Sequence, residues 1–561
     1  MTRTNGRLVV VGIALLAAVF FLSGINWGLP SRSADRFLFG DRPPWTGEQI
    51  ISLAGGWDNS ADRGADIAMH PLAGRDQPIV LNETDAQRAE IVRRFRLYSC
   101  QPDEMITFRS LSRMKPSRGD LDPRFYQYGG LWVYVIGALL KIASLFHFVT
   151  LRTDLAYYLD HPEQFARFYI VARLYAAAWG VLGVLVVYAL AVEWTGKSIA
   201  AITAALLYAT MPVVVNMAHE AKPHLPGAVL TLAAVWAAMR YVCVGSLRWW
   251  IVSGALCGAA FGMVLTGIVA FAIIPVMVLL RPMSWRRRVS VMLAAGAVGV
   301  AVFVATNPYL PLNYLLHRSV VRSNVGNYGN FYKPELSLPA LTNAVRLIGQ
   351  GMSLPLAMVA AISLCVLAIK ATKAHDPAVG CGAENRLTAE PWALGPLFIA
   401  PAALVALQFV LLARDKPAEY ARFALTLDVM LAIATAKALS MLTPTAARGA
   451  AVMLLALSAV AGGKYVAHFR GDHGDQSTRL RAAIELQRQS RPGRTLAVLA
   501  EPAPYCLPPV NLFDWRIVLL PRGGDPSQLP SSDWASVWPQ DVSSDAPISW
   551  ANKPMRIDFK P

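Results

Sequence analysis

The chain has 561 residues, of which 55% are hydrophobic and only 16% are charged. Soluble globular chains carry about 25% charged residues, and disordered chains are poor in apolar ones, so neither class fits. Six cysteines are too few for a disulfide scaffold. An integral membrane protein remains. Its net charge of +16 then fits cytoplasmic loops and anionic membrane lipids, and no nucleic-acid partner is expected.

Long apolar runs predict the membrane spans, because a spanning helix needs about 20 mostly apolar residues. These runs lie at about 8–25, 168–193, 198–217, 225–244, 249–280, 289–306, 352–369, 393–413, 422–442 and 449–467. The run 249–280 is too long for one ordinary span and is interrupted at Leu265-Thr266-Gly267, so it is predicted to form two short helices. About eleven transmembrane helices follow. Two arginines before the first run also fit a signal peptide, although no clean cleavage site follows it.

Positive charge predicts the orientation, because basic clusters stay in the cytoplasm. The strongest cluster is Arg286–Arg288. It lies inside, with the N-terminus, if 129–150 follows the outer interface and 249–280 crosses twice. A second count, in which each of these segments is one span, also keeps the cluster inside. Charge alone therefore leaves both counts open. The first predicts an inner-membrane protein with its C-terminal domain on the outer, periplasmic face.

The fold class expected is an all-α polytopic membrane protein with a long external first loop and a small α/β C-terminal external domain. Residues 1–470 form the transmembrane catalytic domain in this scheme. Its first loop covers about 26–167 and includes an insert at 31–100. The tail, 471–561, has helical spacing at 477–490 and strand-like runs at 495–500 and 517–520. Cys100 and Cys506 both fall outside, either as free thiols or as a disulfide.

Carboxylates are scarce inside the runs and gather beside their outer ends, a pattern that favours a surface enzyme over a pump. Asp103 and Glu104 form one such pair, after Pro102 and before a helical stretch. The pair fits an ordinary helix start, where acidic side chains complement the dipole. It also fits a general base that takes a proton from an acceptor hydroxyl. Tyr126 and Tyr128 follow, either as a headgroup belt or as a platform for sugar stacking.

A second candidate site is the short loop between two long apolar runs that holds His219, Glu220, Lys222 and His224. Snorkelling explains Lys222 alone. A lysine beside an outer carboxylate also suits a phosphate leaving group. His219, Glu220 and His224 offer metal-binding atoms, but their spacing is not a recognised zinc pattern, so no metal is assigned.

A third candidate is the charged segment 414–423 at the outer end of a later run. Mixed charges of this kind usually form a solvated turn. The alternative is a phosphate clamp made by Lys416 and Arg422, because arginine and lysine are the usual partners of phosphate oxygens.

The first of these segments resembles the first external loop of the GT-C glycosyltransferases, on the residues Pro102-Asp103-Glu104, a short helix, and Gly119-Asp-Leu-Asp-Pro123. The most similar branch is the bacterial dolichyl-phosphate-mannose–protein mannosyltransferase/aminoarabinose transferase-like group. Members commonly read His-Pro-Asp-Glu and Gly-Asp-Leu-Asn-Pro, so Gln101 and Asp122 are departures. Weaker matches follow in the family's order at Arg173, at the Glu220 loop, at 265–267, where the family's lysine is missing, and at 306–309 and 420–423.

The resemblance implies an inverting transferase that moves a sugar from a polyprenyl-phosphate donor to an acceptor at the outer face. Asp103 is then the base, Glu104 and Glu220 position the substrates, and Lys222 steadies the phosphate, with Lys416 and Arg422 as further phosphate ligands. Substrate contacts are expected from His219, His224, Tyr126, Tyr128 and Arg173. The expected partners are the lipid-linked donor, membrane lipids and an acceptor that is a protein, a lipid or a polysaccharide. No cofactor is implied. The alternatives are a transporter or flippase of lipid-linked sugars and a non-catalytic assembly protein.

Overall fold

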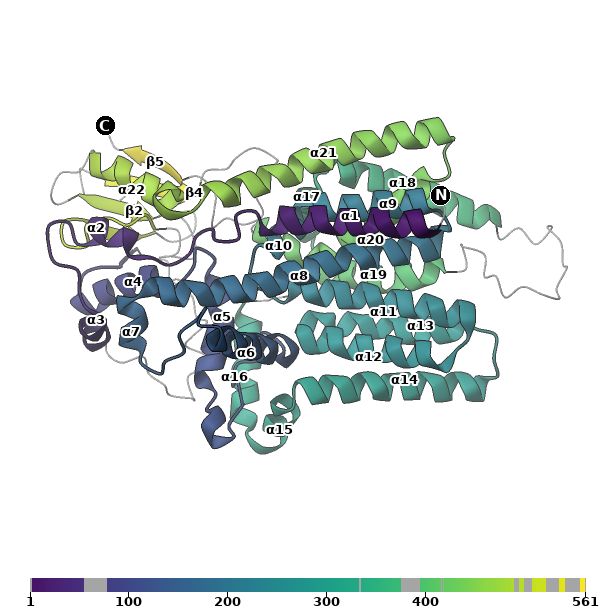
Figure 1. The fold of residues 1–561 in the computed structure, drawn as a ribbon, viewed down its shortest axis with the longest axis horizontal. Coiled ribbons are helices and arrows are strands. Elements are labelled where there is room, and N and C mark those ends of the chain that lie inside the picture. The colour runs from purple at the N-terminus through teal and green to yellow at the C-terminus, as the bar shows by residue number, and fades with distance from the viewer. Residues whose placement is uncertain are drawn as a thin grey trace.

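The structure is a computed structural model that describes residues 3–54, 78–331, 334–374, 394–414, 416, 418–488, 494–498, 507–520, 534–539 and 555–559. Helices dominate, and most of the long ones run side by side along the long axis of the molecule (Figure 1). A small sheet with several short helices lies at one end of this bundle.

Each apolar run that was expected to span the membrane is helical. The bundle helices are α1 (Arg3–Leu22), α8 (Pro162–Thr195), α9 (Ser198–Thr210), α10 (Pro212–Ala218), α11 (His224–Val244), α12 (Leu247–Met263), α13 (Ile273–Leu279), α14 (Trp285–Thr306), α17 (Leu338–Met352), α18 (Leu354–Ala374), α19 (Gly395–Leu412), α20 (Leu425–Leu439) and α21 (Pro444–Gly471). Among the described residues, five helices are long and apolar enough to cross a membrane, or seven if the bent pairs α9–α10 and α17–α18 each make one span. The helical membrane architecture is confirmed at this level, and the count of eleven spans stays a prediction.

The predicted interruption of 249–280 is confirmed. α12 ends at Met263, residues Leu265–Ala272 form the 3-10 segment η4, and α13 follows. Val264, between α12 and η4, has an extended backbone and forms an isolated β-bridge with Tyr128 of the first loop. The break therefore gives the first loop a place to pair with the bundle.

Small residues allow α12 and α14 to approach closely. Gly254 and Gly258 lie one turn apart on α12, and a Cβ atom at Gly258 would meet the carbonyl oxygen of Gly299 at 2.0 Å. A Cβ atom at Gly254 would meet the carbonyl oxygen of Ala295 at 2.5 Å. In lipid the hydrophobic effect does not drive helices together, and close backbone contact at small residues is a common way for them to associate.

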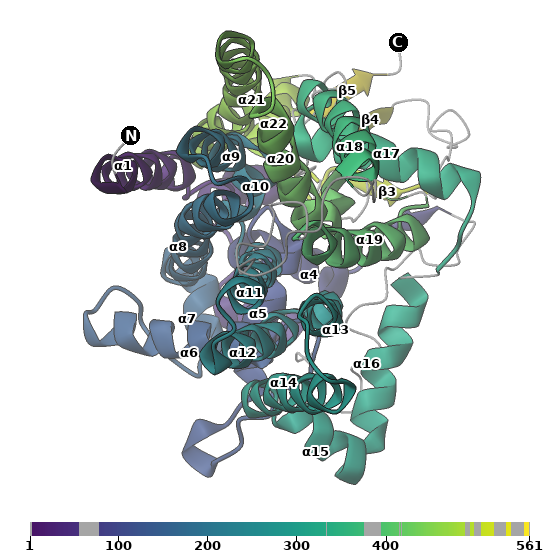
Figure 2. The same cartoon turned by 90° about the vertical axis from the view of Figure 1, so that its right-hand side faces the viewer.

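The apolar segment 129–150 contains a single helix, α6 (Gly130–Leu145). Figures 1 and 2 show α6 running across the direction of the bundle helices instead of alongside them. This direction fits the interfacial helix of the preferred topology. Beyond α14 the chain forms two further helices outside the bundle, α15 (Tyr309–Leu316) and α16 (Arg318–Phe331).

The end of the molecule that holds the sheet combines the first loop with the tail. Its helical elements are η1 (Arg32–Ala34), α2 (Asp35–Leu38), α3 (Gly47–Leu53), α4 (Asp85–Leu97), η3 (Pro116–Arg118), α7 (Leu155–Asp160), η6 (Gly474–Gln476) and α22 (Thr478–Arg488). The strands are β1 (Ile79–Val80), β2 (Thr495–Val498), β3 (Arg516–Leu519), β4 (Trp534–Pro539) and β5 (Met555–Phe559), in the spatial order β1-β3-β2-β4-β5. β2 is parallel to β3 and β4, whereas β1 and β5 are antiparallel edge strands.

The helix and the two strands expected in the tail are present as α22, β2 and β3, but the sheet is not made by the tail alone. β1 comes from the first loop and pairs Ile79 with Leu519 of β3. Asn82 strengthens this junction, since its amide donates to the carbonyls of Leu512 and Trp515 at 2.9 and 2.6 Å. The first loop and the tail thus share one sheet. The choice between free thiols and a disulfide at Cys100 and Cys506 stays open, because Cys506 lies outside the described part of the chain.

The two ends of the bundle differ as the charge pattern predicts. The N-terminus and the loop that leads into α14 lie at one end, and the sheet lies at the other (Figure 1). Figure 2 looks along the bundle from the N-terminal end. The N-terminus and the cluster Arg286–Arg288 at the start of α14 therefore share a side. Assignment of that side to the cytoplasm stays a prediction.

This topology is testable with single cysteines and a membrane-impermeant maleimide on intact cells. Ser284→Cys, beside the basic cluster, is expected to react only after the membrane is opened, because positive loops are retained inside. Gln487→Cys on α22 is exposed and is expected to react at once. The parent protein, labelled in parallel, gives the background from native cysteines. Immediate labelling of Ser284→Cys would reverse the orientation.

Candidate active site

The first acidic pair lies on a tight turn. Pro102–Glu104 form the 3-10 turn η2, which leads into α5 (Met105–Arg113). The side-chain oxygen of Gln101 caps this turn by accepting from the Asp103 backbone N–H at 3.4 Å. The helix-start interpretation is thus correct, and it does not exclude a chemical role, because consecutive side chains on a 3-10 turn point in different directions. Asp103 and Glu104 accordingly have different partners.

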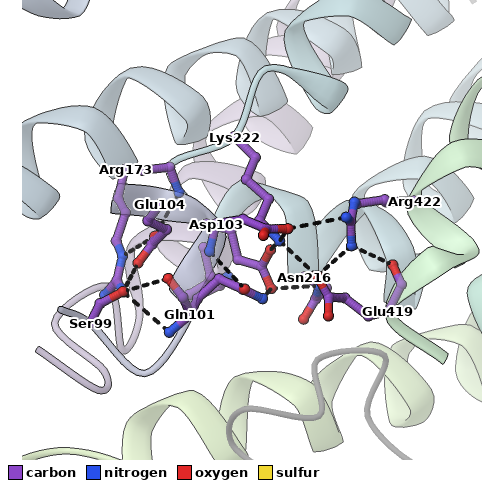
Figure 3. Close-up of polar contacts among 12 residues, drawn as sticks. Ser99, Gln101, Asp103, Glu104, Arg173, Asn216, Lys222, Glu419 and Arg422 are labelled. Carbon is purple, nitrogen blue, oxygen red and sulfur yellow. Dashed lines mark hydrogen bonds and ion pairs between the residues drawn. The ribbon is translucent and has the colours of Figure 1, made fainter. Parts of the chain in front are cut away.

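Lys222 lies at the centre of one group of partners (Figure 3). Its ammonium nitrogen is 3.2 Å from Asp103 Oδ2 and 3.0 Å from Glu220 Oε2. It is also 3.1 Å from Glu419 Oε1. Lys222 has no exposed surface, so burial of its charge is offset by these carboxylates. We call Asp103, Glu220, Lys222, Glu419 and Arg422 the carboxylate–lysine cluster.

Arg422 completes this cluster from the 3-10 segment η5 (Ala418–Ala424). Its Nη2 is 3.1 Å from Asp103 Oδ2, and its Nη1 donates to Glu419 Oε1. The guanidinium also lies over the rings of Tyr420 and Phe423, with centroids at 5.2 and 4.9 Å. The predicted phosphate ligand Arg422 therefore shares its carboxylate partners with Lys222.

The charges within the cluster shift one another. Burial raises the pKa of Asp103, but Lys222 and Arg422 outweigh that effect and hold the pKa below the usual aspartate value. Burial raises the pKa of Glu220 above the usual glutamate value, and Lys222 offsets this only in part. Burial and Arg422 lower the pKa of Lys222, yet the three carboxylates reverse this effect and the pKa is raised. At neutral pH the cluster therefore holds an ionised Asp103 beside a protonated Lys222.

Asp103 is also the most accessible carboxylate of the cluster. Its side chain is 28% exposed, compared with 9% for Glu419 and no exposure for Glu220. A base that takes a proton from a substrate hydroxyl must approach that hydroxyl to hydrogen-bond distance. In the cluster, Asp103 meets this condition best.

Glu104 faces a different partner and is fully buried. Arg173 binds it with both ends of its fork, at 2.8 Å from Nε to Oε1 and 2.7 Å from Nη2 to Oε2. The Ala221 backbone N–H donates to Glu104 Oε1 at 2.7 Å, and Ser99 Oγ donates to Oε2. Arg173 also donates to the carbonyl of Trp27 at 2.7 Å. This pair therefore links three parts of the chain, and its geometry favours positioning over the substrate contact predicted for Arg173.

The two histidines of the second loop have different partners; His219 is buried, whereas His224 is half-buried. His219 is within hydrogen-bond distance of the Val215 and Ser23 carbonyls, at 2.8 and 3.0 Å, and its ring stacks on Phe469. His224 begins α11 and meets the edge of Phe423. Among the described residues no group of three or more His, Cys, Asp or Glu side chains is arranged to hold a metal ion.

The two predicted tyrosines, Tyr126 and Tyr128, bind different partners. The Tyr128 hydroxyl donates to the backbone carbonyl of Asp103 at 3.4 Å, beside the cluster. The Tyr126 hydroxyl donates to Asp122 Oδ1 at 2.9 Å, in a second polar group that includes Asn313. Lys416 lies with its ammonium 5.0 Å from the centre of the Tyr420 ring. Tyr126 thus belongs to this second polar group, and Lys416 lies beside Tyr420.

Four residues of this region were not predicted as site residues. Glu419 lies within the charged segment 414–423, where only Lys416 and Arg422 are predicted as ligands. Asn216 is one helical turn before Glu220 and donates to its Oε1 at 3.0 Å, a pair that the four-residue spacing indicates. Gln101 donates to the same oxygen at 3.3 Å, and Ser99 binds Glu104. No sequence signal distinguishes Ser99 and Gln101 except their place beside the acidic pair.

One comparison with known proteins, the match to a family model, supports the resemblance predicted from the sequence. None of the curated protein sequences matches the chain. Among solved structures, ArnT from Cupriavidus metallidurans in the apo state is 14% identical over 96% of this chain and 94% of that one, with a TM-score of 0.43. The same protein bound to undecaprenyl phosphate is 14% identical over 87% of this chain and 73% of that one, with a TM-score of 0.42. The archaeal oligosaccharyltransferase AglB from Archaeoglobus fulgidus is 13% identical over 85% of this chain and 64% of that one, with a TM-score of 0.40.

Residues 167–310 match the model of the dolichyl-phosphate-mannose-protein mannosyltransferase family, and the predicted resemblance is confirmed by this match.

Proposed function

We propose that this protein is a membrane glycosyltransferase that moves a sugar from a polyprenyl-phosphate donor to an acceptor hydroxyl or amine. The transfer takes place at the outer, periplasmic face of the inner membrane. The family match over residues 167–310 supports the donor class. The observation that carries the chemistry is Asp103, an accessible carboxylate held between the Lys222 ammonium and the Arg422 guanidinium. A base and two cations side by side are what a transfer with a phosphate leaving group requires.

The proposed reaction is one displacement with inversion. Asp103 takes the proton from the acceptor, whose oxygen or nitrogen attacks the anomeric carbon and forms the new glycosidic bond. The bond from that carbon to the phosphate oxygen breaks, and its electron pair leaves with the polyprenyl phosphate. Lys222 and Arg422 stabilise the negative charge that develops on the phosphate. Glu220 and Glu419 hold these cations in place, and Glu104 with Arg173 holds the turn that carries Asp103.

A transporter or flippase of lipid-linked sugars is less well supported. Such a protein needs charged groups along a path across the membrane. Among the described residues, Asp428 of α20 is a buried carboxylate well inside the bundle. The carboxylate–lysine cluster instead joins three segments outside the long helices: the first loop, the loop before α11 and η5.

Replacement of the proposed base is the first test. Asp103→Asn is expected to lower sugar transfer by about 10²–10⁴-fold, because general bases contribute factors of that size. The assay uses purified protein, a defined polyprenyl-phosphate sugar and membrane acceptors. Asp120→Asn is the matched control, since Asp120 lies in the same loop but pairs with Arg124. Transfer at the wild-type rate by correctly inserted Asp103→Asn would contradict the proposed role.

The pH dependence gives a second test. Arg422 helps hold the pKa of Asp103 below its usual value, so Arg422→Gln raises that pKa. A base is active only when ionised, and the acidic limb of kcat/KM is therefore expected to move to higher pH in Arg422→Gln. Arg414→Gln is the control, because Arg414 forms a surface pair with Glu335. An acidic limb at the wild-type position in Arg422→Gln would show that Asp103 does not control it.

The supporting role of Glu104 is tested by stability. Arg173→Met leaves the buried Glu104 carboxylate without its charge partner and is expected to destabilise the fold by about 3–5 kcal/mol. The double variant Glu104→Gln/Arg173→Met removes both charges and is expected to lose less stability. Unfolding of the three purified proteins in the same detergent measures the difference. A double variant at least as unstable as Arg173→Met would argue against an ion pair as the support of this turn.

A further inference from the structure

A second polar site lies between the first loop and the tail, outside the carboxylate–lysine cluster. Here the structure contains a cavity of about 80 Å³. A buried water needs roughly 10–15 Å³ of such space, so the cavity has room for several waters or one small ion. Three parts of the chain form most of its wall: Gly28–Ala34, Arg94–Cys100 and the segment from His473 to Leu480 at the start of α22.

Arg479 lines this cavity with a buried and largely unsatisfied guanidinium. The residue is only 5% exposed. Its Nη2 makes one long contact, 3.5 Å to the Cys100 carbonyl, while Nε and Nη1 have no hydrogen-bond partner among the described residues. A buried charge without hydrogen bonds is costly, and native proteins seldom keep one unless a ligand or water satisfies it.

Asp472 interacts electrostatically with Arg479 but does not satisfy its N–H groups. Burial raises the pKa of Asp472 above its usual value. Asp472 Oδ1 accepts from the Thr478 backbone N–H at 2.8 Å and from its hydroxyl at 3.2 Å, while the buried Oδ2 has no hydrogen-bond partner in the part of the chain that the structure describes. Among the described residues, the guanidinium of Arg479 and the carboxylate of Asp472 form no ion pair within 4 Å, and both retain unsatisfied atoms. Positive charge at the cavity wall is therefore only partly balanced.

The remaining wall suits an anion. Ser31 and Ser477 bring hydroxyl groups, and Ser477 stands directly before α22, whose dipole is positive at this end. The Thr478 and Leu480 N–H groups are bonded to Asp472 and Ser477, so only the dipole of the helix acts on the cavity from this side. Arg94 adds a second guanidinium, which is paired with Glu90 at 2.7 Å. Arginine presents its N–H groups as a planar fork that matches the oxygens of phosphate.

We propose that this cavity binds a phosphate-type oxyanion, with the free edge of Arg479 as its main ligand. The ligand is either free inorganic phosphate or a phosphomonoester group on a larger molecule. The cavity is connected to the proposed active site by direct contacts. Ser99 and Cys100 belong to the cavity wall, and Ser99 also donates a hydrogen bond to Glu104. The proposal does not depend on glycosyl transfer.

Binding is measured by calorimetry on the full-length protein in detergent, with inorganic phosphate and a soluble sugar 1-phosphate as probes and chloride at equal ionic strength as the reference. Phosphate-type ligands are expected to bind the wild type, and Arg479→Gln is expected to lower the affinity at least tenfold. Arg479→Lys keeps the charge without the fork and is expected to fall between them. Arg481→Gln is the matched control, because Arg481 lies on the same helix and is exposed.

The two probes distinguish the sources of the ligand. Tighter binding of inorganic phosphate supports a site for the free ion, and tighter binding of the sugar phosphate supports a site for a phosphomonoester. Absence of binding by both, or equal affinity in Arg479→Gln, would overturn the proposal. In phosphate-free buffer, Arg479→Gln is expected to unfold at or above the wild-type temperature, because it removes an unsatisfied buried charge. A markedly lower unfolding temperature would overturn the proposal by showing that the protein itself satisfies Arg479.

Discussion

The contact of Lys222 with three carboxylates is the interaction on which the proposed site depends. It joins the turn at Asp103, the loop at Glu220 and the segment at Glu419, which are far apart in the sequence. None of these charges is stable in a buried position alone, and each offsets the desolvation of the others. With Arg422 the cluster holds two cations and three carboxylates. The raised pKa of Glu220 favours its uncharged form and so brings the net charge of the cluster closer to zero. Burial of the charges thus requires that the three segments meet.

The buried pair of Glu104 and Arg173 supports this arrangement from the opposite side of the turn. Arg173 comes from α8, a long bundle helix, and its fork holds Glu104 while its Nη1 holds the carbonyls of Ile25 and Trp27. A 3-10 turn presents successive side chains in different directions, so the residue next to Glu104 faces away from this pair. Fixing Glu104 therefore fixes the direction of Asp103. One residue of the acidic pair serves as the anchor, and its neighbour remains accessible.

Much of the architecture follows from short-range patterns in the sequence. Apolar runs identify the bundle helices, Leu265-Thr266-Gly267 marks the break after α12, and the tail shows α22, β2 and β3 because periodicity and β-propensity act locally. Pairing of β1 with β3 joins segments more than 400 residues apart and leaves no local signal. The same limit applies to the site. Charged residues between apolar runs identify Asp103, Glu220, Lys222 and Arg422, whereas the burial of His219 against Phe469 depends on the packing of α21.

The contacts of Lys222 and Arg422 with Asp103 give this pair of cations two purposes in the proposed reaction. Lys222 and Arg422 hold the pKa of Asp103 low, which keeps the base ionised but makes it a weak proton acceptor. A donor phosphate bound to the same cations shares their charge, so their hold on Asp103 decreases and its pKa rises. The base then gains proton affinity only when the leaving group is in place. Glu220 and Glu419 keep both cations anchored during this exchange, which explains why the site contains more carboxylates than the chemistry itself needs.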